Sequence, residues 1–464
     1  MTDPAAADRA FSSLPLAAPV LANLERLGYA TMTPIQAAAL PLALAGRDLI
    51  AQARTGSGKT AAFALALLQR LDTRRFDVQA LVLCPTRELA DQVTTEMRRL
   101  ARAEDNIKVV TLAGGVPLRN QVNSLAHGAH VVVGTPGRVL DHLGRETLQL
   151  DALNTLVLDE ADRMLDMGFH DDMVEVTKRC PKDRQTLLFS ATYPEGIAEL
   201  AARFLRQPAT VKVESQHSAA QIEQRWYEVR EDERLPAVSR LLDHFRPASS
   251  LAFCNTKAQC KQLVELLQAQ GYSALALYGD LEQRERDQVL VQFANRSASV
   301  LVATDVAARG LDIASLAAVI NVDVTPDAEV HVHRIGRTGR AGESGLALNL
   351  ASLDEMGAVG RIEQLQGAPS QWYPLAELKP ASSERLLPAM ATIHIQGGRK
   401  EKIRPGDVLG ALTADLGYSR EQVGKIDVNQ FSTYVAVERG IAREAAKRLD
   451  GGRIKGKGVK ARLL

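Results

Sequence analysis

A glycine-rich segment near the start of the chain has the residue types that bind nucleotide phosphates. Residues 53–60 read ARTGSGKT and connect an apolar run, DLIAQA, to a stretch rich in Ala and Leu. Glycines let successive backbone N–H groups turn toward phosphate oxygens, and the start of the following helix adds partial positive charge. Lys59 would contact the β- and γ-phosphates and Thr60 would coordinate Mg²⁺. A chance glycine-rich turn is the alternative, which the flanking strand and helix patterns disfavour. The predicted phosphate-binding residues are Thr55, Gly56, Ser57, Gly58, Lys59 and Thr60.

Two carboxylates follow an apolar strand pattern much later in the chain, in the sequence LVLDEAD. Ligands of parallel α/β domains bind at the carboxyl ends of the strands, so Asp159 and Glu160 would lie beside the phosphate loop. Asp159 can hold a hydrated Mg²⁺ ion, and Glu160 can polarise the attacking water. An exposed acidic strand end is the alternative. The loop and the carboxylates together predict hydrolysis of a nucleoside triphosphate.

The segment HRIGRTGR, residues 333–340, repeats arginine at three-residue intervals. Guanidinium groups neutralise the charge that develops on a transferred phosphate, so Arg337 and Arg340 could act on the γ-phosphate from a second domain. Hydrolysis would then require two domains to close on each other. A surface arginine cluster paired with acids is the alternative. His331 and His333 have the spacing of one face of a strand, but the sequence places no third ligand near them and predicts no zinc site.

Apolar runs alternate with helical patterns along most of the chain. Unbroken runs rich in Val, Leu and Ile are typical of parallel strands covered by helices on both faces. A first set ends near residues 208–220, where Gln, Ser and Ala replace the apolar runs, and a second set follows. The sequence therefore predicts two α/β domains in tandem. The predicted strands are 48–53, 79–85, 130–136, 155–161 and 186–192, then 250–256, 273–279, 298–305, 317–323 and 344–352.

The last part of the chain differs in pattern and in charge. From residue 389 onward the apolar patterns run β-α-β-β-α-β, which predicts a small ferredoxin-like, RRM-like α+β domain. This segment has 15 Lys and Arg against 8 Asp and Glu, a net charge of +7, whereas the preceding residues have 41 against 47, a net charge of −6. The asymmetry indicates a nucleic-acid-binding module, with a solvated basic face as the alternative. We expect domains at 1–210, 211–365 and 389–464, with a proline-containing linker at 366–388.

Composition restricts the compartment in which the protein works. The four cysteines have spacings that match neither a disulfide framework nor a CxxC metal site, so we expect reduced thiols. The apolar run 35–45 is too short for a membrane helix and contains Pro41. The first residues include Asp3 and Asp8 and lack the basic region of a secretory signal. These observations predict a cytoplasmic protein.

The motifs, in this order, resemble those of the DEAD-box ATP-dependent RNA helicases over about residues 11–365. The resemblance implies two RecA-like domains, ATP and Mg²⁺ as cofactors, and an RNA-dependent ATPase (EC 3.6.4.13 type) that unwinds short duplexes. The residues that carry it are Phe11 with GYATMTPIQ (28–36), PTRELA (85–90), Gly114 and Gly115, TPGR (135–138), SAT (190–192), NTK (255–257), QRER (283–286) and ATDVAARGLD (303–312).

The resemblance also implies roles for single residues. Gln36 would read the adenine, Tyr29 would pack on the base with Phe11 behind it, and Asp312 would touch the ribose. Ser190, Thr192 and His333 would couple the carboxylates to domain closure. Contacts to sugar and phosphate carry no sequence information, so this core should grip RNA without selecting it. The residues implied to face RNA are Arg87, Gly115, Thr135, Arg138, Thr304 and Asp305.

The C-terminal segment, including MATIHIQGGRKEKIRPGDVLGALTADLGY, closely resembles the RNA-binding domain of one bacterial group within this family. That resemblance implies binding to a hairpin of large-subunit ribosomal RNA and a role on pre-ribosomal particles during assembly of the large subunit. The predicted sheet offers only His394 and Tyr434 as stacking residues, so we expect recognition at basic edges instead. Those edges contain Arg399, Lys400, Lys402 and Arg404 after the first strand, and Arg453, Lys455, Lys457, Lys460 and Arg462 near the end of the chain.

Two other functions fit the same motifs. The protein could be a general DEAD-box helicase whose tail grips RNA without selectivity, or an ATP-gated RNA clamp or assembly scaffold whose ATPase serves only for release. The complete catalytic set disfavours a pure binding module, and the motif spellings disfavour a DNA helicase. No membrane partner is predicted. We expect a monomer, although no motif specifies the oligomeric state.

Overall fold

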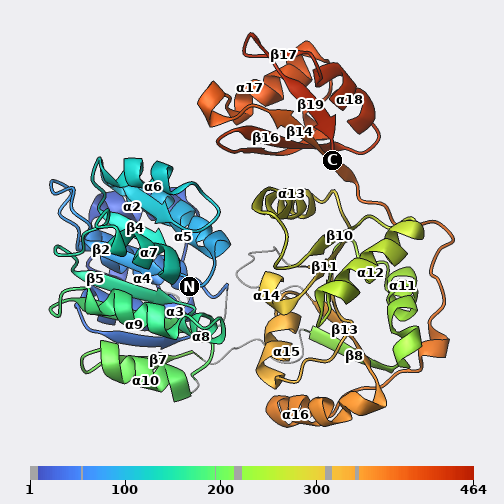
Figure 1. The fold of residues 1–464 in the computed structure, drawn as a ribbon, viewed down its shortest axis with the longest axis horizontal. Helices are drawn as coiled ribbons and strands as arrows, with labels where there is room; N and C mark the ends of the chain where they lie inside the picture. The colour runs from blue at the N-terminus through green and yellow to red at the C-terminus, as the bar shows by residue number, and fades with distance from the viewer. Residues whose placement is uncertain (1–8, 54–55, 194, 214–221, 309–315, 340–343) are drawn as a thin grey trace, which may run out of the picture. The chain divides into compact units, whose positions relative to one another are not determined.

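The computed structural model describes residues 9–53, 56–193, 195–213, 222–308, 316–339 and 344–464. The chain divides into two compact units, and the described residues of the first unit run from 9 to 213. The second unit contains another parallel sheet and the C-terminal domain. Figure 1 shows the ribbon of each part, with helices around its sheet.

The first unit is a seven-stranded parallel sheet with the strand order β3-β4-β2-β5-β6-β1-β7. Its central strands are completely buried, as unbroken apolar runs predict. Strand β3 was not predicted from the sequence. The strands are β1 Leu49–Gln52, β2 Ala80–Leu83, β3 Val109–Leu112, β4 Val131–Gly134, β5 Thr155–Asp159, β6 Gln185–Ser190 and β7 Ala209–Lys212.

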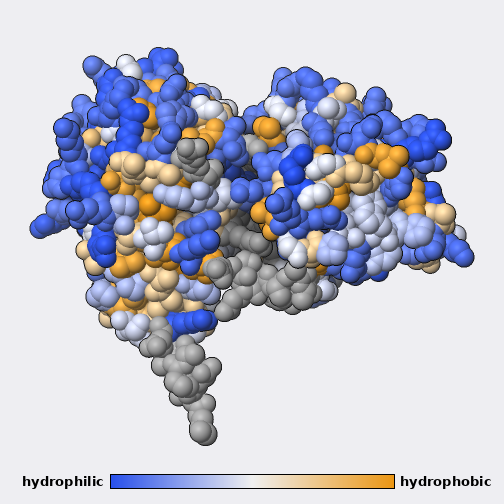
Figure 2. Space-filling model, turned by 90° about the horizontal axis from the view of Figure 1, so that it is seen from below, coloured by the Kyte–Doolittle hydropathy of each residue, from blue (hydrophilic) through white to orange (hydrophobic). Residues whose placement is uncertain are grey.

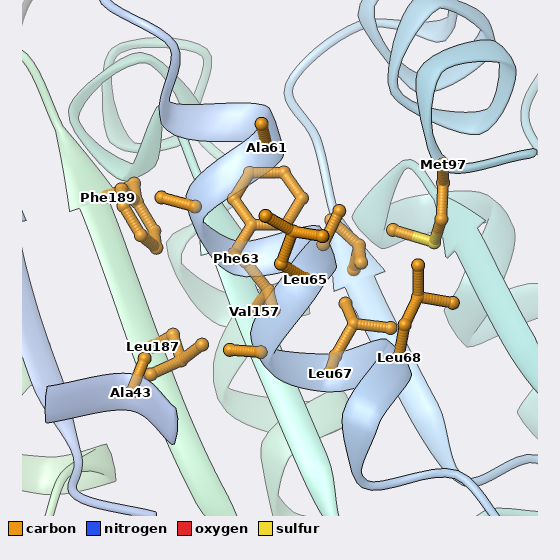
Figure 3. Packing of buried hydrophobic residues seen from close by; sticks show 14 of the residues in the cluster. Ala43, Ala61, Phe63, Leu65, Leu67, Leu68, Met97, Val157, Leu187 and Phe189 are labelled. Carbon is orange, nitrogen blue, oxygen red and sulfur yellow. The ribbon is translucent and has the colours of Figure 1, made fainter. Parts of the chain in front are cut away.

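Helices cover both faces of this sheet and form a buried cluster on each. In the cluster around α4, the helix packs Phe63 against Phe189 of β6, with ring centroids 5.4 Å apart (Figure 3). Because α4 begins at Lys59, this packing also fixes the end of the phosphate loop. The helices are α2 Ala18–Arg26, α3 Pro34–Leu44, α4 Lys59–Gln69, α5 Arg87–Leu100, α6 Leu118–Leu125, α7 Pro136–Gly144, α8 Ala161–Asp166, α9 His170–Lys178 and α10 Glu195–Phe204.

The second unit begins with a six-stranded parallel sheet in the order β10-β11-β9-β12-β13-β8, of which β8 was not predicted from the sequence. Its strands are β8 Ile222–Glu228, β9 Ser250–Phe253, β10 Ala274–Leu277, β11 Val300–Ala303, β12 Ala318–Asn321 and β13 Gly345–Ala351. Its helices are α11 Arg234–Phe245, α12 Lys257–Ala269, α13 Gln283–Ala294, α14 Asp305–Ala308, α15 Ala328–Ile335 and α16 Met356–Gln366. The prediction of two tandem α/β domains is confirmed.

The prediction that His331 and His333 lie on one face of a strand is wrong, because both belong to helix α15. His331 is buried and His333 is partly exposed, so the two side chains have different surroundings. A two-residue spacing over so short a segment does not distinguish a strand from a helix. No cluster of His, Cys, Asp or Glu that could hold a metal occurs among the described residues.

The C-terminal domain has the predicted β-α-β-β-α-β order, with an antiparallel sheet β15-β16-β14-β19. Its first helix is short and continues into a π-helical turn, Ala411–Asp415. A two-stranded hairpin precedes the last strand. The elements are β14 Met390–Gln396, α17 Pro405–Gly410, β15 Val423–Val428, β16 Ser432–Glu438, α18 Ala442–Leu449, β17 Arg453–Ile454, β18 Lys457–Gly458 and β19 Lys460–Leu463.

The predicted linker packs on the second parallel-sheet domain. The backbone N–H of Trp226 donates to the carbonyl of Gln371 at 2.9 Å, and the N–H of Tyr373 donates to the carbonyl of Trp226 at 2.8 Å. The rings of Trp226 and Trp372 lie 5.7 Å apart. This segment is therefore held along β8 at the edge of the sheet.

The surface and the thiols fit the composition. On the face in Figure 2, hydrophilic residues predominate and apolar residues form scattered patches. All four cysteines are free, in agreement with the expected reduced thiols, and all four are buried. Within the described ranges, no helix is both long and apolar enough to span a membrane.

Candidate nucleotide and RNA sites

The phosphate loop connects β1 to α4 through two glycines with left-handed backbone. Gly56 has φ 81° and Gly58 has φ 92°, which residues with a Cβ atom rarely adopt. A Cβ atom on Gly58 would lie 2.6 Å from Nε2 of Gln36. Lys59 is 6% exposed, and its Nζ atom has no hydrogen-bond partner among the described residues, nor has Oγ of Ser57. Buried polar atoms without partners are rare in proteins, so this loop is shaped for a ligand.

Gln36 is attached directly to this loop. Its Nε2 donates to the carbonyl of Gly58 at 3.0 Å, and its Oε1 accepts from the backbone N–H of Thr33 at 2.9 Å. The second bond belongs to a capping box that begins α3. The residue predicted to read adenine is thus 1% exposed and linked to the phosphate cradle.

Phe11 and Tyr29 form an aromatic pair in the same unit, with perpendicular rings 6.0 Å apart. Phe11 is buried and Tyr29 is partly exposed. The Tyr29 hydroxyl donates to Glu96 of α5 at 2.5 Å. Burial and this bond raise the pKa of Tyr29 far above its usual value, so the ring stays neutral.

The carboxylates lie at the carboxyl end of β5, as predicted. Asp159 ends the strand, and Glu160 follows with φ 53°, ψ 51°, a left-handed conformation that is uncommon for residues other than glycine. Burial raises the pKa of Asp159 to about 7, with the charge of Lys59 opposing the shift and Glu160 adding to it. Glu160 also faces Arg163, whose Nε lies 3.4 Å from its Oε2.

These residues fit a magnesium ion. Oδ1 of Asp159 is buried without a hydrogen-bond partner in the described part of the chain, and oxygen is the ligand type that Mg²⁺ prefers. Thr60 lies in the first turn of α4, directly after Lys59. A cation beside Asp159 would favour its ionised form and offset the cost of burial.

Asp162 ties the carboxylate segment to the SAT segment after β6. Its Oδ2 accepts hydrogen bonds from the N–H of Ala191 at 3.1 Å, the N–H of Thr192 at 3.0 Å and the Thr192 hydroxyl at 3.1 Å. Although burial opposes it, the Lys59 charge and the Thr192 bond lower the pKa of Asp162. The sequence predicted coupling through Ser190 and Thr192 but not through Asp162, the residue that makes the connection.

The predicted residues of the second parallel-sheet domain are partly described. Arg337 is 5% exposed and follows α15, which contains His333. Asp312 and Arg340, also predicted for this domain, lie outside the described part of the chain, and so does Thr55 of the phosphate loop in the first unit.

Arg334 organises this region. Its guanidinium forms a two-point ion pair with Asp305, with both N···O distances 2.7 Å, and donates to Oδ1 of Asn255 at 3.1 Å. It is 2% exposed. One buried arginine therefore joins the NTK and ATD segments, and the carboxylate of Asp305, predicted to face RNA, is engaged by it. The adjacent Thr304 is partly exposed.

In the first unit, the segments predicted to face RNA meet at a residue that was not predicted from the sequence, Gln121 of α6. Its Oε1 accepts from Nη1 of Arg138 at 2.8 Å and contacts Nε2 of His142 at 3.0 Å. Its Nε2 donates to the carbonyl of Ala113, directly before Gly114 and Gly115, at 2.8 Å. Gln121 thus fixes the TPGR arginine relative to the double-glycine turn.

The other predicted RNA residues of this unit lie at helix starts or in turns. Thr135 precedes α7 and makes no capping hydrogen bond with its side chain. Gly115 is exposed with φ 74°. Arg87 begins α5, with Nε 3.4 Å from Oε1 of Glu88.

Seven of the basic residues predicted for the C-terminal domain form one surface, built from the loop after β14 and the β17–β18 hairpin, whereas Lys460 and Arg462 belong to β19. Nζ of Lys455 donates to the carbonyl of Lys402 at 3.2 Å, and Nζ of Lys457 donates to the carbonyl of Glu401 at 3.3 Å. We call this the basic surface; its exposed members are Arg399, Lys400, Lys402, Arg404, Arg453, Lys455 and Lys457.

Three family models match the chain. They are a DEAD/DEAH box helicase model over residues 33–200, a helicase conserved C-terminal domain over 233–342 and a DbpA RNA binding domain over 392–463. The chain belongs to the DEAD-box family of ATP-dependent RNA helicases. It binds ATP and RNA and carries an RNA-binding C-terminal domain.

Within this family the chain is similar to the ATP-dependent RNA helicase DbpA of Escherichia coli, with 54% identity over 98% of this chain and 99% of the relative. It is 45% identical to the ATP-dependent RNA helicase CshA of Listeria monocytogenes over 76% of this chain and 68% of that protein. Among solved structures, S. cerevisiae Dbp5 bound to RNA and ADP BeF3 matches with a TM-score of 0.73 and 32% identity, over 79% of this chain and 96% of that one.

Proposed function

We propose that this chain is an RNA-dependent ATPase that locally opens short RNA duplexes, anchored by its C-terminal domain to a hairpin of large-subunit ribosomal RNA. It would act in the cytoplasm, on pre-ribosomal particles, during assembly of the large subunit. The observation that carries the anchor is the basic surface, where two segments about 50 residues apart present their cations together. The similarity of the C-terminal domain to the DbpA RNA binding domain supports the same proposal.

The nucleotide site would perform the hydrolysis. Lys59 and the loop N–H groups would hold the phosphates, and Gln36 would carry adenine contacts to the loop through Gly58. Mg²⁺, held by Thr60 and Asp159, would neutralise phosphate charge. Glu160 would orient the attacking water, and Arg337 and Arg340 would reach the γ-phosphate when the two helicase domains close.

Closure would convert ATP binding into strand separation. Asp162 joins the carboxylate segment to Thr192, so a change at the phosphates reaches the SAT segment through three hydrogen bonds. The closed domains would grip one strand by sugar and phosphate and bend it, so that it cannot stay paired. Release of phosphate would reopen them. Unwinding of this kind is local and needs no translocation along the duplex.

A charge-matched pair of triple variants tests the anchor. Lys400→Gln, Lys402→Gln and Arg404→Gln together should raise the concentration of a large-subunit ribosomal RNA fragment that half-saturates ATPase stimulation. The salt dependence of log Kd should fall by up to about 0.7–0.9 for each phosphate that the variant no longer binds. The control, Arg443→Gln, Lys447→Gln and Arg448→Gln, removes three exposed cations from α18 and should change neither quantity. If the two triple variants changed RNA binding equally, the basic surface would be rejected as the specific anchor.

The same assay separates the two alternatives. Equal stimulation by the ribosomal fragment and by an unrelated structured RNA would favour a general helicase. ATP hydrolysis without opening of a short duplex would favour a clamp. Glu160→Gln should abolish hydrolysis while ATP still binds, and full activity of this variant would reject Glu160 as the catalytic carboxylate.

A further inference from the structure

The open face of the C-terminal sheet is covered. RRM-like domains commonly stack bases on aromatic residues of this face. Here the two rings on it, His394 and Tyr434, are each 3% exposed and pack on each other 5.1 Å apart. On the same face, the Thr392 hydroxyl lies 2.7 Å from Oγ of Ser297 and 3.2 Å from Nδ2 of Asn295, both from the preceding domain of the same unit. A base therefore cannot reach these rings.

A different aromatic residue is exposed on the basic surface. Phe431, in the turn between β15 and β16, is 57% exposed. Nζ of Lys400 lies 4.4 Å from the centre of its ring. A cation over one face of an aromatic ring leaves the opposite face available for stacking with a planar group. Phe431 is thus an aromatic side chain in water, next to cations that would bind phosphates.

Backbone contacts fix the position of this ring. The N–H of Arg399 donates to the carbonyl of Asn429 at 2.8 Å, and the N–H of Lys400 donates to the carbonyl of Gln430 at 3.1 Å. The carbonyl of Phe431 itself accepts from the N–H of Gly397 at 3.0 Å. The two loops approach so closely that a Cβ atom on Gly398 would lie 2.2 Å from the carbonyl oxygen of Asn429. The ring and the basic loop therefore form one preorganised surface.

We propose that Phe431 is a stacking site for an unpaired base of the anchoring RNA, with the surrounding cations holding the phosphates on either side. A paired base presents only its edges, so the site takes a base from a loop or bulge and not from a continuous duplex. This inference rests on the proposed function of the C-terminal domain as an RNA anchor. It adds that the RNA is recognised through an exposed base as well as through its charge.

Two substitutions of Phe431 in the full chain test the proposal, with binding followed by fluorescence anisotropy. The probes are a large-subunit ribosomal RNA hairpin and the same stem as a blunt, fully paired duplex. Phe431→Leu should weaken hairpin binding roughly 5- to 100-fold, because base stacking on an aromatic ring contributes that much. The salt dependence should not change, since the cations that bind the phosphates all remain. Phe431→Trp should restore the affinity, and duplex binding should be unaffected.

Controls exclude a general effect on the turn or on charge. Gln430→Ala alters the neighbouring exposed side chain without touching the backbone bonds and should leave hairpin affinity unchanged. Lys400→Gln should lower the salt dependence, unlike Phe431→Leu. Unchanged hairpin affinity in Phe431→Leu, or equal affinity of the Leu and Trp variants, would overturn the stacking site.

The same measurements distinguish failure of the stacking site from failure of the proposed selective anchoring to ribosomal RNA. If the wild-type chain binds the ribosomal hairpin and an unrelated hairpin equally and Phe431→Leu weakens both, the selective anchor fails and the stacking site stands. If the wild-type chain prefers the ribosomal hairpin and Phe431→Leu binds it equally well, the stacking site fails and the anchor stands.

Discussion

The nucleotide site and the cluster around Gln121 are both buried in the first unit, but they differ in how their polar atoms are paired. Around the phosphate loop, Ser57 Oγ, Lys59 Nζ and Asp159 Oδ1 have no hydrogen-bond partner in the described residues. In the cluster, both ends of the Gln121 amide are bonded, and His142 contacts Gln121 through one ring nitrogen and Thr147 through the other.

The difference separates two kinds of functional residue. An unpaired buried polar group costs on the order of 1–3 kcal/mol, so a site that keeps several of them is stabilised when a ligand supplies the partners. A fully paired cluster needs no ligand and instead fixes the direction of side chains that reach the surface. We therefore expect the nucleotide site to bind ATP and the Gln121 cluster to position Arg138.

The largest expected effect comes from filling the space that the nucleotide site keeps open. Gly58→Ala would place a methyl group 2.6 Å from Nε2 of Gln36, on a backbone with φ 92°. We expect ATP affinity to fall by about 100-fold or more, since both the loop and Gln36 must move. Titration with a fluorescent ATP analogue measures this decrease.

Gly168→Ala is the matched control for backbone strain. Gly168 also has a left-handed φ, 78°, but a Cβ atom there meets nothing within 4 Å. Both variants should lose similar thermal stability, while only Gly58→Ala should lose ATP binding. Equal ATP affinity in the two variants would mean that the loop tolerates a displaced Gln36.

The paired cluster should respond differently from the nucleotide site. Gln121→Met keeps the volume but removes three hydrogen bonds, so Arg138 loses one of its two carbonyl-type acceptors. We expect the RNA concentration for half-maximal ATPase activity to rise about tenfold, since the change is on the order of 1 kcal/mol. The KM for ATP at saturating RNA should not change. Steady-state ATPase assays with varied RNA and varied ATP separate the two quantities.

Gln121→Glu distinguishes positioning from folding. Glutamate retains the oxygen that faces Arg138 and His142 but replaces the donor to the Ala113 carbonyl with a second acceptor oxygen, so it should restore the RNA dependence in part. Burial and the charge of Arg138 lower the pKa of His142 in the wild-type protein. A carboxylate at position 121 would favour the imidazolium and raise that pKa, which NMR can follow. A change in the KM for ATP in Gln121→Met would contradict the separation of the two regions.

The sequence was sufficient to predict features formed by residues that are close together along the chain. The phosphate loop and the two carboxylates could be placed because strand, loop and helix follow one another directly along the chain. The Gln121 cluster could not, because it joins Ala113, Arg138 and His142 through a polar residue on an otherwise ordinary helix pattern. The covered face of the C-terminal sheet was also beyond reach, since Thr392 meets Asn295 and Ser297 across about 100 residues of sequence.

The wrong assignment of His331 and His333 to a strand came from a spacing pattern that is too short to identify a strand. Three residues are compatible with a strand or a helix, and the flanking residues decide between them. The N-cap of α15 is Asp327, whose side chain accepts from the N–H of Glu329 at 2.8 Å. An Asp before a helical pattern is a recognisable start signal, and it could have identified the helix.

The smallest expected effect is on the free energy of unfolding and concerns the second unit. It tests a buried histidine, His331, whose side chain already has a hydrogen-bond partner. His331 contacts Oε1 of Gln224 through Nε2 at 3.2 Å and stacks on Trp226 at 5.5 Å. Burial, aided by the charge of Arg334, lowers its pKa to about 3. Because the unfolded chain binds the proton near pH 6.5 and the folded chain does not, stability should be complete above pH 6.5 and fall as the pH decreases toward 3.

Trp fluorescence reports this decrease locally, since Trp226 and Trp372 are the two tryptophans of the chain and lie together. Between pH 7.5 and pH 6.0 the His331 contribution to the free energy of unfolding should fall by about 0.8 kcal/mol, measured by denaturant unfolding. His331→Gln should remove this change while retaining a donor toward Gln224. His170→Gln, at a half-exposed position in the first unit, should leave the pH dependence as in the wild type. An unchanged pH dependence in His331→Gln would mean that the folded protein accommodates the imidazolium. In that case, a buried group with all its hydrogen bonds made could still change its charge. Sites that need a ligand to pair their polar atoms would then have to be distinguished from fully paired clusters by geometry alone.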